Sequence, residues 1–546
     1  MLSEWQGRFG DSITKPAAGY TNEHMNMIFR RLILGGLATV LMAAPVLAEP
    51  KTELVLAIGG EPDTGYDPLL GWGRYGHPLF QSTLLKRDAE LATRPDLARS
   101  WSLSADRLTW TIELRKDARF SDGAPLTATD VAFTFNEGAK AGGALDLTVL
   151  KRATAIDDTT VRIELKQPWI TFAENFYSLG IVPAARYGEG YASDPVGSGP
   201  YRLVSWTHGE QLIVEANPDY YGPRAEFEKI TFLFTDEDTS LAAARAGQVD
   251  MVSVPAALAD LTPDGFKLLS VQSVDNRGIT FPIPEPGLGE DGKVIGNAIT
   301  SDRAIRRAIN LGIDRDKLVE VALLGHGTPA YGPADGLPWS NPEAGISYDP
   351  EKARALLDEA GWIAGDDGIR ARNGVRAAFA INYPASDSTR QALTVALAEL
   401  LKPLGIEATA RGQSWDRIEA VMHAEPVMFG WGSHSPLEVY NLYQSRLSGV
   451  DYFNVGYFSD AAVDGHLAAA QAAGSLEASH EQWRQAAWDG SDGFGPKGEA
   501  GWAWLVNLDH LYFVNECLDV GATQTEPHGH GWPITALIEQ WRWTCE

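Results

Sequence analysis

The sequence predicts an α/β protein with more than one domain. Segments typical of strands alternate with segments typical of helices along most of the chain, which is the pattern of α/β architecture. Hydrophobic residues make up 44% of the chain and Trp alone occurs 17 times, enough to build packed cores. Single cores stop growing near about 250–300 residues, so a chain of 546 residues should form two or three domains.

The first 48 residues have the features of a polar extension followed by a signal peptide. Arg30 and Arg31 precede an apolar run over residues 32–47, which ends at the small residue Ala48. The alternative is a membrane anchor, but the run is shorter than the roughly 20 residues that span a bilayer. We expect cleavage after Ala48 and a periplasmic location.

In the first half of the chain, alternation of apolar and polar residues predicts strands, and capping residues predict where helices start. Thr127 can cap a helix in which Asp130 returns a hydrogen bond to the cap backbone. A Gly/Pro-rich turn at 195–200 leads into a hairpin. Strands are expected at 53–58, 108–114, 161–165, 211–216 and 229–234, and a further strand follows the turn and ends at 206. Helices are expected at 79–85 and 240–247, and a further helix begins at 127.

The second half continues the alternation. The segment 389–404 has an amphipathic pattern and ends at Gly405, a residue suited to close a helix. Further helices are expected at 302–311, 350–361 and 415–423, and strands at 378–383, 406–410 and 427–430.

The net charge and the cysteines restrict the partners and the redox environment. A formal charge of −27 repels nucleic acid and anionic membrane lipids, so neither is expected as a partner. The two cysteines, Cys517 and Cys545, lie near the C-terminus. In an oxidising compartment a disulfide between them would contribute about 3–4 kcal/mol. Two unpaired thiols are the alternative.

An ordered set of short segments identifies a family. These segments are 98–123, 126–133, Val196-Gly-Ser-Gly-Pro-Tyr201, Ala216-Asn-Pro-Asp-Tyr-Tyr-Gly222, 246–250, 304–310, 348–353 and 356–362. In this order and at these spacings the chain resembles the dipeptide, oligopeptide and nickel-binding family, family 5, of extracellular solute-binding proteins of ABC transporters. The segments identify the scaffold and not the cargo.

The resemblance implies a two-lobed periplasmic binding protein of the class II type, with an extra inserted subdomain and a ligand cleft between the lobes. Lobe I would comprise 49–82, 195–280 and 505–546, the inserted subdomain 83–194, and lobe II 281–504. Closure of the lobes about their connecting strands would trap the ligand.

The same resemblance implies the function. The protein would be a monomeric substrate-binding protein and not an enzyme, delivering a small polar solute to the permease and ATPase subunits of an importer. The solute would be a nickel or other metal chelate, or a short peptide. No cofactor is expected other than a transition metal that belongs to the ligand.

Candidate ligand-binding residues come from three segments. One follows the strand at 427–430, at the end of a strand where α/β lobes bind ligands. Arg277 lies near the expected hinge and would suit a ligand carboxylate, or would form an ion pair with Asp275 instead. The family places ligand-facing residues in an early loop, here with Trp72 and His77. The candidates are Trp431, Ser433, His434, Tyr440, Asn441, Arg277, Tyr75 and Arg74.

Two histidines near the C-terminus form a candidate metal pair. His528 and His530 flank a glycine, and imidazole suits Ni, Cu or Zn. Two ligands alone make a weak metal site, and a solvated turn is the alternative.

Three other functions are alternatives to solute binding. A secreted hydrolase would need a nucleophile and a base together in the cleft, and no such constellation is evident. The glycines of 287–292 match a dinucleotide-binding pattern but follow prolines rather than a strand. A secreted chaperone or sensor without a transporter is a third class.

Overall fold

The structure is a computed structural model that describes residues 51–76, 78–142, 145–290, 292–529 and 532–545. The predicted signal peptide lies outside the described residues. Within the described ranges, none of the helices combines the length and the apolar character that crossing a bilayer requires.

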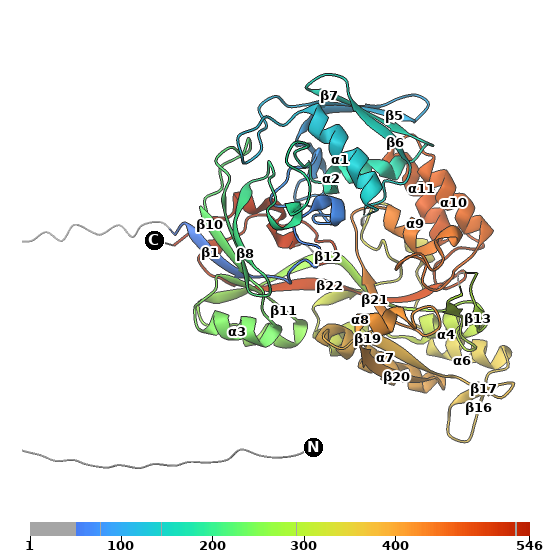
Figure 1. Cartoon of the computed structure of the whole chain (residues 1–546). Coiled ribbons are helices and arrows are strands. Elements are labelled where there is room, and N and C mark those ends of the chain that lie inside the picture. Colours follow the sequence, from blue (N-terminus) through green and yellow to red (C-terminus); the bar gives the residue numbers. More distant parts are fainter. Residues whose placement is uncertain (1–50, 77, 143–144, 291, 530–531, 546) are drawn as a thin grey trace, which may run out of the picture. The chain divides into compact units, whose positions relative to one another are not determined.

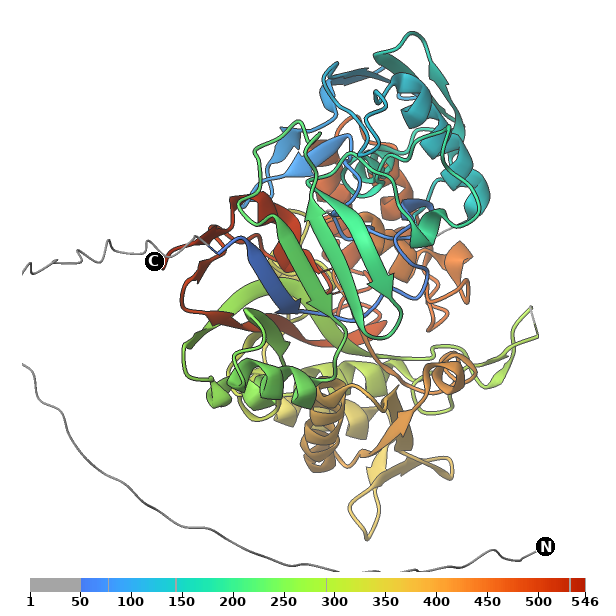
Figure 2. The same ribbon diagram turned by 60° about the vertical axis from the view of Figure 1, so that its left-hand side comes forward.

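A mixed sheet of nine strands forms the centre of the fold. Its order is β21-β12-β22-β11-β1-β10-β9-β8, with β15 also paired to β22. β1 lies parallel to β10 and β11, and the hairpin β8–β9 extends the sheet, as Figure 2 shows. The strands are β1 Glu53–Ala57, β8 Tyr201–Thr207, β9 Gln211–Ala216, β10 Lys229–Leu233, β11 Met251–Val254, β12 Phe266–Thr280, β15 Gly327–Pro329, β21 Met428–Trp431 and β22 Trp502–Asn515.

The longest strands, β12 and β22, pair antiparallel from Phe266 opposite Asn515 to Thr280 opposite Trp502. In Figure 1 they cross between the inserted sheet above and the helices α4, α6 and α7 below. Their register shifts between Gln272 and Asn276. Such a bulge leaves residues unpaired with the partner strand and re-aims their side chains, here Asp275.

The segment 83–194 contains an antiparallel sheet of order β4-β5-β7-β6 packed against helix α1. Thr127 and Asp130 form the predicted capping box at the start of α1, which confirms that helix start. Its elements are β2 Leu85–Arg87, β3 Thr93–Pro95, β4 Ala98–Leu103, β5 Thr109–Leu114, α1 Ala128–Ala141, β6 Leu150–Ala155, β7 Thr160–Leu165, η2 Ile170–Glu174 and α2 Asn175–Ser178.

A second α/β unit surrounds the parallel pair β19 and β20, which helix α7 connects. Its elements are α4 Arg303–Gly312, α5 Arg315–Leu323, α6 Pro350–Glu359, β19 Ala378–Pro384, α7 Ser388–Leu401, β20 Glu407–Gln413 and α8 Trp415–Glu419. The remaining α-helices and strands are α3 Glu237–Arg245, β13 Gly287–Leu288, β14 Val294–Ile295, β16 Ile363–Ala364, β17 Arg370–Arg372, β18 Val375–Arg376, α9 Leu437–Tyr443, α10 Ala461–Gln471, α11 Leu476–Ala487, β23 Leu518–Asp519 and β24 Arg542–Trp543.

The predicted helix at 79–85 is wrong. Leu79 has a left-handed φ of 57°, and Leu85 already belongs to β2. The Gly199 N–H donates to the Phe80 carbonyl at 2.8 Å, so the backbone here bonds to a distant segment instead of to itself. An apolar run of this length cannot be told from a helix by periodicity alone.

The C-terminus is fixed against the main body. Cys517 and Cys545 are joined by a disulfide with a Cα–Cα distance of 5.2 Å, next to the strand pair β23–β24. The Thr544 N–H also donates to the Cys517 carbonyl at 2.8 Å.

Candidate ligand-binding site

A cavity of about 630 Å³ lies where four separate segments meet. Its lining comes from the loop 60–75, residues 275 and 277 of β12, the start of α7, and the loop 528–532. This volume falls within the range of small-molecule sites. Both aromatic and charged side chains line it, so it suits a compact polar solute.

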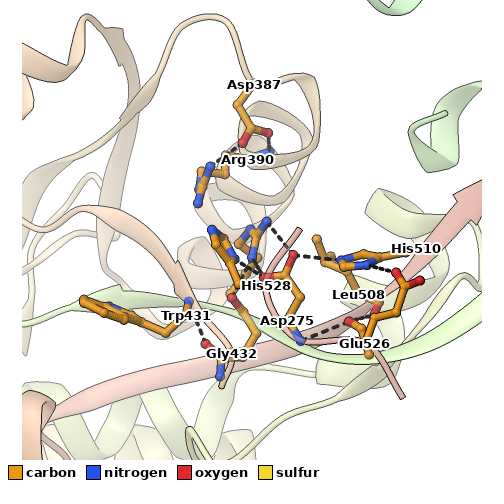
Figure 3. A network of polar contacts seen from close by, with 12 residues as sticks. Asp275, Asp387, Arg390, Trp431, Gly432, Leu508, His510, Glu526 and His528 are labelled. Atoms are coloured by element: carbon orange, nitrogen blue, oxygen red, sulfur yellow. Dashed lines mark hydrogen bonds and ion pairs between the residues drawn. The ribbon is translucent and has the colours of Figure 1, made fainter. Parts of the chain in front are cut away.

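Asp275 is the centre of a buried ionic network at this cavity (Figure 3). The guanidinium of Arg277 pairs with both of its carboxylate oxygens. His528 Nδ1 lies 2.5 Å from Oδ1, and His510 Nε2 lies 3.0 Å from Oδ2. Burial alone would raise the pKa of Asp275, but Arg277 and His528 outweigh it and hold the pKa well below its usual range. Asp275 is therefore an anion, which only accepts hydrogen bonds.

His510 connects Asp275 to a second buried acid. Its Nδ1 lies 2.5 Å from Glu526 Oε2, which also accepts a hydrogen bond of 2.9 Å from the Tyr512 hydroxyl. A ring that bridges two carboxylates needs both nitrogens protonated. Burial opposes this charge, yet the bonds to Asp275 and Glu526 raise the pKa of His510 to about 9. For His528, in contrast, burial lowers the pKa, which favours the neutral ring.

Arg390 brings a second guanidinium to the cavity from the first turn of α7. Asp387 caps this helix, accepting the Arg390 N–H at 2.7 Å and pairing with its guanidinium. Figure 3 shows the Arg390 side chain extending from α7 toward the Asp275 network. Burial, and then the charge of Arg277, lower the pKa of Arg390 to about 10.

The two arginines retain capacity for a ligand. Arg277 and Arg390 are 6% and 8% exposed, and both line the cavity. Guanidinium groups at the edge of a cavity are suited to a carboxylate.

Aromatic side chains form another part of the lining. Trp532 stacks on Phe232 with ring centroids 4.3 Å apart. Trp72 packs edge-on against Trp532, with ring centroids 5.3 Å apart. Trp72 is held in place because its Nε1 donates to the Pro78 carbonyl at 2.6 Å. The Tyr75 ring lies 5.7 Å from that of His528, and the Arg74 guanidinium lies 4.9 Å from the Tyr75 ring.

Comparison with known families decides what kind of protein carries this site. Residues 92–453 match the model of bacterial extracellular solute-binding proteins, family 5 Middle. The chain belongs to family 5 of these proteins. It is 34% identical to Protein XP55 of Streptomyces lividans over 498 residues, which cover 88% of each protein.

Two solved structures share the fold of this family 5 protein. NikZ from Campylobacter jejuni, in complex with Ni(L-His), has a TM-score of 0.79 at 23% identity and covers 90% of this chain and 100% of its own. AppA from Bacillus subtilis, an oligopeptide-binding protein in complex with a nonapeptide, has a TM-score of 0.71 at 23% identity, covering 91% and 100%. These findings confirm the predicted family and the two-lobed α/β fold. They also confirm the prediction that the chain is a solute-binding protein of the ABC importer type.

Several predicted site residues of the family 5 protein meet at the cavity. Arg277, Tyr75, Arg74, Trp72 and His528 all line it. His77 and His530 lie outside the described residues. Across the described ranges, no group of three or more His, Cys, Asp or Glu side chains is arranged to hold a metal ion. The metal pair His528 and His530 therefore stays a prediction.

The other predicted contacts lie beside the cavity rather than in its lining. The Trp431 N–H donates to Asn276 Oδ1 at 3.0 Å, and the Ser433 hydroxyl accepts the Ser435 N–H at 3.1 Å. His434 Nε2 lies 2.8 Å from the Thr525 carbonyl. Ligand contact by these residues stays a prediction.

Tyr440 and Asn441 lie further along the same segment. Tyr440 is 4% exposed and packs edge-on against Trp169 at 5.0 Å. The Asn441 carbonyl accepts the Asn454 N–H at 3.0 Å. Ligand contact by Tyr440 and Asn441 likewise stays a prediction.

Sequence reasoning missed Arg390, His510, Glu526 and Trp532. Asp387 three residues before Arg390 is a helix-capping signal that could have placed Arg390 in the first turn of α7. No local signal marks His510, because it lies within the long strand β22 and its two carboxylate partners come from other segments.

Glu438 is a buried acid next to the Asp275 network, and we expect it to make the stability of the fold depend on pH. Burial raises its pKa to about 8, although the Gly432 N–H donates to it at 3.0 Å. Unfolding returns the pKa toward 4.5, so the folded state holds one more proton between about pH 4.5 and 8, and stability falls as the pH rises through this interval. Glu438→Gln mimics the protonated acid and should match the wild type at pH 5.

At pH 9 the free energy of unfolding of Glu438→Gln should exceed that of the wild type by on the order of 3 kcal/mol. Urea midpoints of both proteins at the two pH values measure this. An equal midpoint difference at pH 5 and pH 9 would show that Glu438 does not titrate in this interval.

Proposed function

We propose that this protein is the periplasmic, monomeric receptor of an ABC importer, and that it binds a compact carboxylate-bearing metal chelate, with nickel as the leading metal. The observation that carries the proposal is the pair Arg277 and Arg390, two largely buried guanidinium groups that line one cavity. The receptor would deliver its solute to a permease and an ATPase. The lobes would be those predicted from the sequence. Lobe I would comprise 49–82, 195–280 and 505–546, with the subdomain 83–194 inserted, and lobe II would comprise 281–504.

The acids of the cavity favour an anionic group over a free amine. Asp275 is already paired with Arg277 and two histidines. Asp387 is occupied as the cap and ion pair of Arg390. Glu61 accepts hydrogen bonds from the Trp206 indole and the Gly209 N–H. Asp63, which also lines the cavity, keeps a short peptide as the second candidate because it could bind an amine.

His528 supports a metal in the cargo. Its Nδ1 donates to the ionised Asp275 carboxylate, which fixes the ring orientation and makes Nε2 the basic nitrogen. Metal-ligating histidines characteristically have a carboxylate partner of this kind. In this proposal His528 adds one ligand to a metal that arrives with its own chelator.

Isothermal titration calorimetry tests the choice of cargo. The titrants are Ni(II) with two equivalents of L-histidine, Ni(II) alone, L-histidine alone, and a set of di- and tripeptides. We expect heat of binding with the complex and much weaker signals from its separate components. Binding of peptides but not of the complex would move the assignment to peptide transport. Recovery of cleaved peptide or ester would favour the hydrolase alternative.

A further inference from the structure

A second region of contact, remote from the cavity, joins two segments that are far apart in the sequence. Side chains of 83–194 share one hydrophobic core with those of α9, α10 and α11, and Figure 1 shows these helices beside the inserted sheet. None of the residues that line the cavity belongs to the contacts described next. We call Trp169, Thr171, Tyr440, Arg446 and Gln471 the remote contact.

Polar bonds cross the buried part of the remote contact. The Thr171 hydroxyl donates to Gln471 Oε1 at 2.7 Å, and the Thr171 N–H approaches the same oxygen at 3.4 Å. Thr171 and Gln471 are 0% and 1% exposed. Close by, the Arg107 guanidinium donates to the Ala472 carbonyl.

Aromatic and cationic groups complete the remote contact. Trp169 packs edge-on against Tyr440, and the Arg446 guanidinium lies 5.6 Å from the Trp169 ring and 5.3 Å from the Tyr440 ring. Each of these residues has its partner on the other segment. The contact therefore contributes stability only while the two segments stay together.

Unsatisfied donors limit that stability. Gln471 Nε2 and Trp169 Nε1 are buried, and neither donates to any partner among the residues described. Water would satisfy both if the contact opened, whereas an unpaired buried donor costs roughly 1–3 kcal/mol. Packing thus opposes opening, while these two donors favour it.

The inserted segment is attached to the opposite side of the proposed hinge. The Ser121 N–H donates to the Gly197 carbonyl at 2.8 Å, and the Tyr221 hydroxyl donates to Asp96 at 2.5 Å. Residues 440–471, in contrast, lie between β21 and β22 in the proposed lobe II. Rotation of the lobes about β12 and β22 would separate the remote contact.

We propose that the remote contact is a latch, which closes together with the cleft and sets how much of the protein is in the closed form. The proposal rests on the two-lobed closure of the proposed function. Ligand affinity scales with the fraction of binding-competent protein, so the latch contributes to affinity through closure.

The test is Thr171→Lys, with Thr134→Lys as the matched control. Thr134 is also 0% exposed but lies inside α1, where its hydroxyl donates to the Asp130 carbonyl at 2.7 Å. If Thr171 becomes solvated on opening, the lysine is accommodated in the open form, and Thr171→Lys should keep a thermal midpoint close to that of the wild type. Thr134→Lys forces a charge into a permanent core and should lower the midpoint strongly.

Affinity supplies the second measurement, with the Ni(II)–L-histidine complex as the probe. Thr171→Lys should weaken binding by about tenfold or more because closure is blocked. The milder Gln471→Ala should weaken it less, again with an unchanged midpoint. An equal fall in the midpoint of Thr171→Lys and Thr134→Lys would overturn the latch, and so would a stable Thr171→Lys with wild-type affinity.

The two proposals can fail separately. If the wild type does not bind the probe, the assignment of the cargo fails. The comparison of midpoints between Thr171→Lys and Thr134→Lys needs no ligand and still decides whether the remote contact opens.

Discussion

Arg390→Ala is expected to weaken binding of the Ni(II)–L-histidine complex by about 2 kcal/mol, roughly thirtyfold in Kd. The variant removes a buried guanidinium from the cavity and so the charge-assisted hydrogen bonds that a ligand carboxylate would receive. The fold should persist, because the Asp387 carboxylate still accepts the backbone N–H of residue 390 and caps α7. Calorimetry on wild type and variant measures the change.

Arg390→Lys is the matched control. It keeps the positive charge but cannot donate two parallel hydrogen bonds, so its affinity should lie between those of the wild type and Arg390→Ala. Equal affinity of all three proteins would mean that the ligand does not use this guanidinium, and the carboxylate assignment would have to be given up.

Asp275→Asn should have the largest effect on stability. The carboxylate is 2% exposed and is the counter-ion of Arg277 and of the imidazolium of His510. Removing one partner of a buried ionic network costs about 3–5 kcal/mol, because the remaining charges stay buried without compensation. The urea midpoint at pH 7 should fall accordingly.

The acid dependence should change in the same variant. The pKa of Asp275 is depressed in the folded protein, so its contribution to stability is present above the unfolded value of 3.8 and is lost as the pH falls through the folded pKa. Asp275→Asn loses it at every pH. Asp117→Asn is the control, since Asp117 pairs with Arg115 at the surface with its side chain 66% exposed, and it should change the midpoint little. Similar midpoints for the two variants would show that the Asp275 network does not stabilise the fold.

Local patterns were enough to predict much of the fold. Thr127 and Asp130 predicted a helix start because a capping box is a contact within one turn. The strands at 211–216 and 229–234 show alternating burial in the structure, as their sequences indicate. The amphipathic helix at 389–404 was placed to within a few residues of α7.

The parts that could not be predicted depend on contacts between distant segments. His510 and His528 reach Asp275 from segments more than two hundred residues away in the chain, and Glu526 joins the network through His510. The bulge in β12 that places Asp275 appears only when β22 is paired with it. Similarly, the segment 79–85 is not helical because its backbone bonds to Gly199 and neighbouring residues.

The candidates on the segment 431–441 illustrate the same limit. A strand end is a sound place to expect ligand contact, and Trp431 does lie at the end of β21. Which side chains then line a cavity depends on the opposing segments. Here those segments bring Arg277 and Arg390 to the cavity and pack Tyr440 against Trp169.

The proposed function requires that two lobes close on a ligand and leave it chemically unchanged. Small-angle X-ray scattering with and without the Ni(II)–L-histidine complex tests this closure most directly. The radius of gyration should fall when the complex is added, and native mass spectrometry of the same sample should show the complex bound with its mass unchanged. An unchanged radius of gyration at a concentration where calorimetry shows saturation would contradict closure, and a bound species of altered mass would contradict the assignment as a binding protein.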